Sequence, residues 1–358
     1  MKILCVIDSL GSGGAQRQLV NLAVAFKEKG HDVDFLVYHN DNFYLNFLEK
    51  NGIKVIFSIE KSYIKRVFKI RKIIRNGKYN TVLSFLEAPN FICELAVLPF
   101  KSWRLIVGER SANPDILKSF KLILFRFLHI FSDYVVANSY ENINIVKKVN
   151  PILRNSKCHV IYNLIDFDKW SPKLDEYIFK NNGKLKISIA ARHHYLKNLN
   201  CLVEAVNLLS DSEKSQLLIE WYGREEDHSL SEALIKIHKY KLHDVFNFYP
   251  ATIDIHKKVN ASDVVGLFSF YEGLPNAVCE GMVNGKLVIS SNISDVPMLI
   301  EPQFIFDPNI PSELTSVLKR VLSLSENEFK NIGQSNRNKA LKLFSEDVVV
   351  TSYLNLFD

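Results

Sequence analysis

Cysteine is scarce in this sequence and shows no pattern of pairing. The five cysteines are scattered, odd in number and never arranged as C-x-x-C; they stand at positions 5, 93, 158, 201 and 279. This argues against a disulfide framework and against a structural zinc site. Unpaired cysteines of this kind are typical of a protein from a reducing compartment.

Long apolar runs are missing as well. The run within Met1–Asp8 is too short for a signal peptide, and it predicts a buried strand. The longest greasy segment, residues 116–131, is interrupted by Lys118, Lys121 and Arg126. We therefore expect no membrane-spanning helix.

Two common ligand-binding patterns are absent. The first loop, Asp8–Arg17, contains Gly11, Gly13 and Gly14, but Gln16 replaces the third glycine of G-x-G-x-x-G. A nicotinamide dehydrogenase is thus disfavoured, although glycines before a helix still suit a phosphate. The ten histidines show no metal-binding spacing, and we interpret the D-x-D triplet Asp166–Asp168 as structural. We expect no metal and no cofactor.

The order of apolar runs predicts two α/β domains. A chain of 358 residues exceeds the usual size of a single core. Short β-rich runs alternate with helical patterns, which favours parallel sheets covered on both faces. The pattern restarts at Leu185 after a polar stretch, residues 166–183. We expect two Rossmann-like doubly wound domains, 1–165 and 166–337, with ligands at the carboxyl ends of the strands.

Positive charge gathers in the first half. Residues 1–165 hold 24 Lys+Arg and 13 Asp+Glu, a net of +11, whereas residues 166–358 have a net of −5. Much of the excess lies in residues 61–78, where basic residues surround apolar ones at helical spacing. Such a helix can lie on anionic lipid headgroups, or it can be an ordinary surface helix. Nucleic acid is disfavoured because no binding motif is recognised.

Two charged pairs in the second half predict a site for a phosphorylated sugar. Glu272 and Glu280 flank a glycine turn and the start of a helix. Carboxylates accept hydrogen bonds from ribose or hexose hydroxyls, and a helix N-terminus faces anions. Arg192 and Lys197 follow a predicted strand and suit a diphosphate. His193 and His194, beside Arg192, are expected to be solvated.

Together these segments resemble the retaining glycosyltransferases of family 4, which have the GT-B fold. The resemblance covers nearly the whole chain. The segments that carry it are Gly13–Arg17, Ala137–Ser139 with Val160–Asp166, Arg192 with Lys197 and Asn198, and Glu272–Asn276 with Glu280, the E-x7-E signature. It implies two domains facing an interdomain cleft, with residues 338–358 returning to the first domain.

The resemblance also implies a division of roles. Glu272 would contact the transferred sugar, while Arg192 and Lys197 would neutralise the leaving diphosphate. A front-face mechanism, in which the donor phosphate takes the acceptor proton, would need no separate base. The remaining donor-binding residues would be Gly13, Gly14, Asn198, Gly273, Leu274, Asn276, Ala277 and Glu280.

The sequence departs from the family where many members carry a histidine near the sugar. Here Glu109 and Arg110 stand there; they would orient the acceptor or the donor sugar, or form a surface ion pair of little energy. The loop after Phe248 also lacks the usual glycine. Base identity therefore rests on the family alone, which favours uridine diphosphate.

The acceptor suggested by the resemblance is a polyprenyl-diphosphate-linked saccharide of surface polysaccharide synthesis, such as O-antigen or capsule. We expect a cytoplasmic protein, peripheral at the inner membrane face through residues 61–78 and 116–131. Two alternatives remain: a nucleotide-sugar epimerase or phosphorylase of the same fold, and a non-catalytic sugar-nucleotide binding protein.

Overall fold

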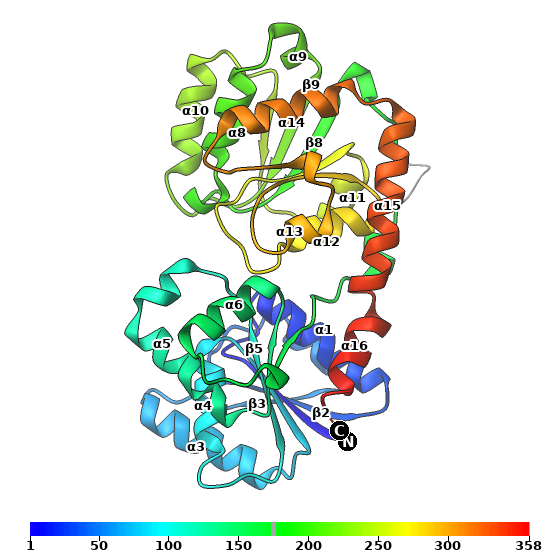
Figure 1. The fold of residues 1–358 in the computed structure, drawn as a ribbon. Helices are drawn as coiled ribbons and strands as arrows, with labels where there is room; N and C mark the ends of the chain where they lie inside the picture. The colour runs from blue at the N-terminus through cyan, green and yellow to red at the C-terminus, as the bar shows by residue number, and fades with distance from the viewer. Residues whose placement is uncertain (173–176, 358) are drawn as a thin grey trace. The chain divides into compact units, whose positions relative to one another are not determined.

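The structure, a computed structural model, describes residues 1–172 and 177–357. It contains two parallel sheets, each with helices on its faces (Figure 1). The chain divides into two compact units: unit 1 comprises Met1–Leu164 and Glu346–Asp358, and unit 2 comprises Ile165–Ser345. The return to unit 1 was expected from Asn338, but it begins at Glu346, because residues 338–344 continue a helix of unit 2.

Unit 1 is a seven-stranded parallel sheet with the order β3-β2-β1-β4-β5-β6-β7. The strands are β1 Lys2–Val6, β2 Asp32–Val37, β3 Lys54–Phe57, β4 Thr81–Phe85, β5 Arg104–Glu109, β6 Tyr134–Ala137 and β7 Cys158–Val160. Its helices are α1 Gly14–Glu28, α2 Leu45–Lys50, α3 Tyr63–Asn76, α4 Glu87–Ala96, α5 Phe120–Phe127, α6 Tyr140–Val149 and α16 Glu346–Leu354, with 3-10 turns η1 Pro114–Lys118 and η2 Leu128–Phe131.

Unit 1 has two hydrophobic cores, one on each face of its sheet, because successive side chains of a strand point to opposite faces. Ile3 and Cys5 of β1 pack with α1 and α16 on one face. Leu4 and Val6 pack with α3, α4 and α6 on the other. Successive side chains of a strand point to opposite faces, so a continuous apolar run is buried on both.

Unit 2 is a six-stranded parallel sheet with the order β10-β9-β8-β11-β12-β13. Its strands are β8 Leu185–Ala190, β9 Leu217–Tyr222, β10 Phe246–Tyr249, β11 Val264–Leu267, β12 Leu287–Ser291 and β13 Ile305–Phe306. Its helices are α7 Phe167–Trp170, α8 Leu199–Asn207, α9 Asp211–Ser215, α10 Ser229–Lys239, α11 Ile255–Asn260, α12 Asn276–Val283, α13 Val296–Leu299, α14 Pro311–Ser323 and α15 Glu326–Phe344, with a 3-10 turn η6 at Tyr195–Lys197. Helix α8 packs against α10 and α14, and α12 packs against α15.

Both sheets reverse their strand order at an internal point: between β1 and β4 in unit 1, and between β8 and β11 in unit 2. In doubly wound sheets, ligands bind at the carboxyl edge beside such a reversal, which is called the switch point. The prediction of two doubly wound α/β units is confirmed. Among the helices described, none combines the length and the apolar character needed to cross a membrane.

Candidate functional site

Three of the charged residues predicted for the site of unit 2 lie near its switch point, the place between β8 and β11 where the strand order reverses. Arg192 and Lys197 follow β8, and Glu272 follows the neighbouring strand β11. The N–H of Phe270 donates to the carbonyl of Leu196 at 2.9 Å, which joins the two loops. Sequence positions about 80 residues apart are thus held together at one edge of the sheet.

Lys197 and Glu272 form a direct ion pair. The Lys197 ammonium contacts Glu272 Oε1, and the Ser269 hydroxyl donates to the same oxygen at 2.9 Å. The two charged side chains are only 18 % and 22 % exposed. An anionic ligand that binds Lys197 therefore competes with Glu272 for it.

Arg192 belongs to a second charged cluster. Its Nη1 donates to Glu226 Oε2 at 2.6 Å, while Arg224 donates to Glu226 Oε1 from Nε and Nη2 at 3.0 and 2.7 Å. Although partial burial raises the pKa of Glu226, the two arginines outweigh it and the net shift is downward. The loops after β8 and β9 lie close, since a Cβ on Gly223 would come within 1.9 Å of the Ala191 carbonyl oxygen.

Helix α12 provides the third part of the site. Its N-cap is Pro275, and no side chain caps its first turn. First-turn N–H groups, including that of Ala277, lack carbonyl partners within a helix. Glu280, one turn further along, is 6 % exposed. The Gly273 carbonyl accepts a hydrogen bond from Ser294, which fixes the turn before the helix.

Asn198 and Leu274 are buried residues of the loops that follow β8 and β11. Asn198 adopts the left-handed conformation, with φ 55°, donates from Nδ2 to the Pro308 carbonyl at 2.8 Å, and accepts from the Cys201 N–H. Leu274 is buried. These contacts support a positioning role for the Asn198 side chain.

In unit 1, the glycine-rich loop precedes α1 as expected. Gly13 is the N-cap and Gly14 is the first helical residue. Gln16 turns back, and its Nε2 donates to Asp8 Oδ1 at 3.0 Å. A Cβ on Gly13 would lie 2.2 Å from Gln16 Oε1, so a larger residue there would displace the Gln16 side chain from its present position.

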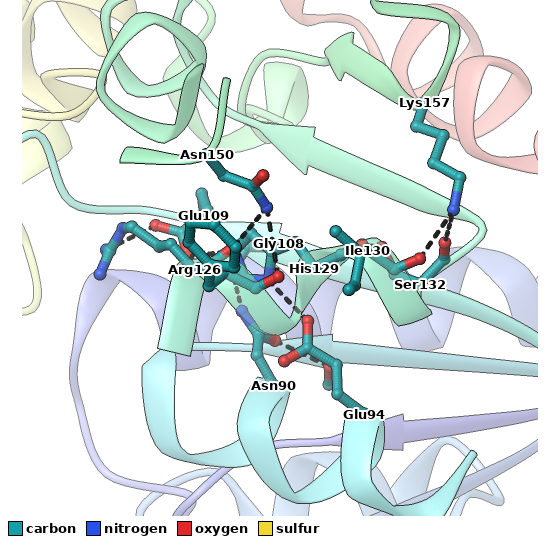
Figure 2. Close-up of polar contacts among 12 residues, drawn as sticks. Asn90, Glu94, Gly108, Glu109, Arg126, His129, Ile130, Ser132, Asn150 and Lys157 are labelled. Carbon is teal, nitrogen blue, oxygen red and sulfur yellow. Dashed lines mark hydrogen bonds and ion pairs between the residues drawn. The ribbon is translucent and has the colours of Figure 1, made fainter. Parts of the chain in front are cut away.

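Glu109 is the centre of a buried charge network (Figure 2). Its Oε2 accepts from Arg126 Nη2 at 2.7 Å, and its Oε1 contacts His129 Nε2 at 3.1 Å. His129 Nδ1 in turn contacts Glu94 Oε1 at 2.6 Å. All four residues are at most 3 % exposed. The alternative of a surface ion pair is therefore wrong, because both carboxylate oxygens of Glu109 are used inside the unit.

Burial and charge oppose each other in this network. Burial would lower the pKa of His129, but the carboxylates of Glu94 and Glu109 raise it to about 9. Burial likewise disfavours ionised Glu109, yet Arg126 and His129 hold its pKa below the usual value. The network thus carries charged His129 and ionised Glu109 at neutral pH.

Arg110 faces a different direction from Glu109. Its Nη1 donates to Asn163 Oδ1 at 3.2 Å, Nη2 donates to the Tyr353 hydroxyl, and the guanidinium lies 3.7 Å from the Phe85 ring centroid. It connects the end of β4 to α16.

Several site residues were not predicted. Arg224 and Glu226 follow β9 in the charged run 224–227, and charges directly after a strand were a usable signal. Arg126 gave no such signal, because its partners lie far away in sequence. His193 was expected to be solvated, but it is buried and stacks on Trp221 with ring centroids 5.6 Å apart. Asp166 caps α7 by accepting from the Lys169 N–H at 2.9 Å, a structural contact.

The fold and these loops define the class of protein. The structure resembles Anabaena HepE in complex with UDP, with a TM-score of 0.87, 17 % identity and 99 % coverage of each chain. It also resembles a Rickettsia africae glycosyltransferase, with a TM-score of 0.81, 21 % identity, and 99 % and 97 % coverage. The fold is the two-domain GT-B fold of glycosyltransferases.

Family models narrow the class. "Glycosyltransferase Family 4" matches residues 12–169, and "Glycosyl transferases group 1" matches residues 171–339. The chain belongs to family 4 of the glycosyltransferases.

Two curated relatives align with most of this chain. A Campylobacter jejuni α-1,4-N-acetyl-D-galactosaminyltransferase, named for the acceptor GalNAc-α-(1→4)-GalNAc-α-(1→3)-diNAcBac-PP-undecaprenol, is 26 % identical over 82 % of this chain and 79 % of its own. An uncharacterized Haemophilus influenzae glycosyltransferase is 24 % identical over 91 % of each.

Proposed function

We propose that this glycosyltransferase moves a sugar, with retention of configuration, from a nucleotide diphosphate sugar to a hydroxyl of a polyprenyl-diphosphate-linked saccharide. One observation supports a nucleotide diphosphate sugar as the donor: Arg192, Lys197 and Glu272 lie on neighbouring loops at the switch point of unit 2. The UDP bound to HepE supports uridine diphosphate, and the undecaprenol-linked acceptor in the C. jejuni enzyme's name supports the acceptor class.

In this mechanism the cations act on the leaving group. Breaking the glycosidic bond leaves charge on the diphosphate, and fixed cations stabilise that charge in the transition state. Lys197 would leave its Glu272 partner to contact the diphosphate, and Glu272 would then accept from sugar hydroxyls. Glu280 would accept from the ribose. With Arg192 and Lys197 present, no metal is required for charge neutralisation.

Transfer can be tested with a panel of nucleotide sugars and a membrane extract as the source of acceptor. We expect Lys197→Ala and Arg192→Ala each to lower turnover by about 100-fold, as for other groups that stabilise developing charge. Glu272→Gln should reduce transfer, and EDTA should leave it unchanged. An epimerase or phosphorylase would convert donor without lipid, and a binding protein would convert none; either result contradicts transfer.

We further propose that unit 1 rests on an anionic membrane surface. On α3, Ile70 and Ile74 face the core, whereas Ile64 and Phe68 are 67 % and 66 % exposed. Around α5, Phe120 is 81 % exposed. Helix α4 packs against both α3 and α5, so the helices that carry these exposed side chains are close neighbours in unit 1. Exposed apolar groups near lysines are typical of interfacial binding.

Vesicle flotation tests this surface. We expect the protein to float with vesicles containing anionic lipid and to be released by salt, because charge screening weakens headgroup contacts. Phe68→Ser with Phe120→Ser should lower flotation several-fold, whereas Ile253→Ser, an exposed apolar residue of unit 2, should not. Equal flotation with neutral lipid alone would contradict the electrostatic part of the proposal.

A further inference from the structure

Glu87 lies where a doubly wound sheet binds its ligand. It is the second residue after β4 and the first of α4. The strand order of unit 1 reverses between β1 and β4, so Glu87 and the glycine-rich loop after β1 flank the switch point. The Glu87 side chain is 31 % exposed, in contrast to the buried Glu94 and Glu109.

A buried arginine holds this carboxylate in place. Arg126, which is fully buried, donates from Nη2 to Glu87 Oε1 at 3.4 Å and to Glu109 Oε2 at 2.7 Å. Glu109 is itself fixed by His129, which is fixed by Glu94 (Figure 2). Charges of alternating sign thus extend from the core of unit 1 to its carboxyl edge, and Glu87 is the exposed end.

The backbone beneath Glu87 is fixed as well. Asn90, one turn along α4, donates from Nδ2 to the Gly108 carbonyl at 3.0 Å and accepts from the Ser84 hydroxyl at 2.7 Å. These contacts join α4 to β4 and β5. A ligand therefore meets a carboxylate whose helix and counter-charge are already in position.

The chemistry of Glu87 selects a neutral, hydroxyl-rich ligand. Its Oε1 contacts Arg126, and Oε2 has no partner among residues 1–172 and 177–357. An ionised carboxylate only accepts hydrogen bonds, so it suits hydroxyl donors. A phosphate would be repelled by this carboxylate, because the guanidinium that Glu87 contacts is shared with Glu109.

We infer that Glu87 binds a hydroxyl of a sugar ring during transfer, with Arg126 and Glu109 as its positioning residues. This inference rests on the proposed transfer of a sugar between two saccharides. Two rings have the required chemistry: the transferred sugar of the donor and the acceptor sugar.

The test compares Glu87→Gln with the wild-type enzyme in two assays: transfer to the lipid-linked acceptor and donor hydrolysis by water without acceptor. Loss of a hydrogen bond to a charged group should lower kcat/KM by roughly 10- to 100-fold. If only the transfer activity falls and the KM for the acceptor rises, the ring that Glu87 binds is the acceptor sugar. If transfer and hydrolysis both fall and the KM for the donor rises, the ring that Glu87 binds is the transferred sugar. Unchanged kinetics in both assays overturns the inference.

Further variants separate binding from folding. Glu87→Asp keeps the charge on a shorter chain and should retain intermediate activity. Arg126→Lys keeps the buried charge but cannot bridge two carboxylates, so it should reproduce the kinetic pattern of Glu87→Gln per folded molecule, with the Tm of unit 1 measured alongside. Glu49→Gln, at an exposed position on α2, is the matched control. A fall in Tm with activity per folded molecule unchanged would make Glu87 structural and overturn the inference. If the wild-type enzyme transfers no sugar, the proposed function fails instead.

Discussion

Glu226 accepts hydrogen bonds from two arginines at the carboxyl edge of unit 2. Arg192 and Arg224 both donate to it, and their side chains are 52 % and 64 % exposed. In the absence of ligand the cluster of three has a net charge of +1. In the proposed donor site, a diphosphate would have to draw Arg192 away from this carboxylate, so Glu226 would lower donor affinity while it holds the arginine in place.

We therefore expect Glu226→Gln to bind UDP more tightly, by about 2- to 5-fold, the range expected for an exposed ion pair. The gain should disappear in high salt, because exposed charges are screened. Calorimetric titration with UDP measures both effects. Glu232→Gln, an exposed carboxylate on the nearby helix α10, should leave affinity unchanged. Weaker binding by Glu226→Gln would show that positioning of the arginines outweighs their neutralisation.

At the scale of elements, the network of β5, α4, α5 and η2 should make stability depend on pH. His129 is faced by Glu94 from α4, Glu109 from β5 and, through Glu109, Arg126 from α5. Its pKa rises from 6.5 unfolded to about 9 folded. A raised pKa stabilises the folded state fully below the unfolded pKa, and the contribution is lost as pH rises through the folded pKa.

We expect the free energy of unfolding of unit 1 to fall by on the order of 3 kcal/mol between pH 6.5 and 9, at about 1.4 kcal/mol for each pH unit. Burial also raises the pKa of Glu94, which acts in the same direction. Urea unfolding across this range measures the slope. The double variant Glu94→Gln with His129→Gln keeps hydrogen-bonding groups without the charges, so its slope should be much flatter. Equal slopes in both proteins would contradict this account.

The same elements show what the sequence could predict. β1 and β4 were predictable because they are short and mostly apolar, a pattern that sheets buried on both faces favour. That Lys197 and Glu272 belong to one site was expected from the family resemblance. Arg126 could not be placed, since its burial depends on Glu109, 17 residues away, and on the packing of α5 against α4. A two-residue strand such as β13 is too short to leave a periodic pattern.

At the scale of the whole molecule, the C-terminal segment completes a core formed by the first residues of the chain. Val349, Val350 and Tyr353 of α16 are buried beside α1. The Phe26 ring of α1 contacts Tyr353 and Phe357, with centroids 6.2 and 5.2 Å apart. The segment follows α15, which belongs to unit 2, so unit 1 cannot complete its core until the chain has passed through unit 2.

Removal of residues 346–358 should therefore unfold unit 1 and spare unit 2. Five buried apolar side chains are lost, at about 1.5–3 kcal/mol each, which is comparable to the whole stability of a domain. We expect calorimetry to show one transition in the truncated chain and protease to digest residues 1–164 selectively. Tyr353→Phe is the matched control: it keeps the packing and removes only the hydroxyl that accepts from Arg110, so both transitions should persist. If truncation left both transitions at their original temperatures, the core around β1 and α1 would be sufficient without α16, and the aromatic contacts of Phe26 would contribute little to folding.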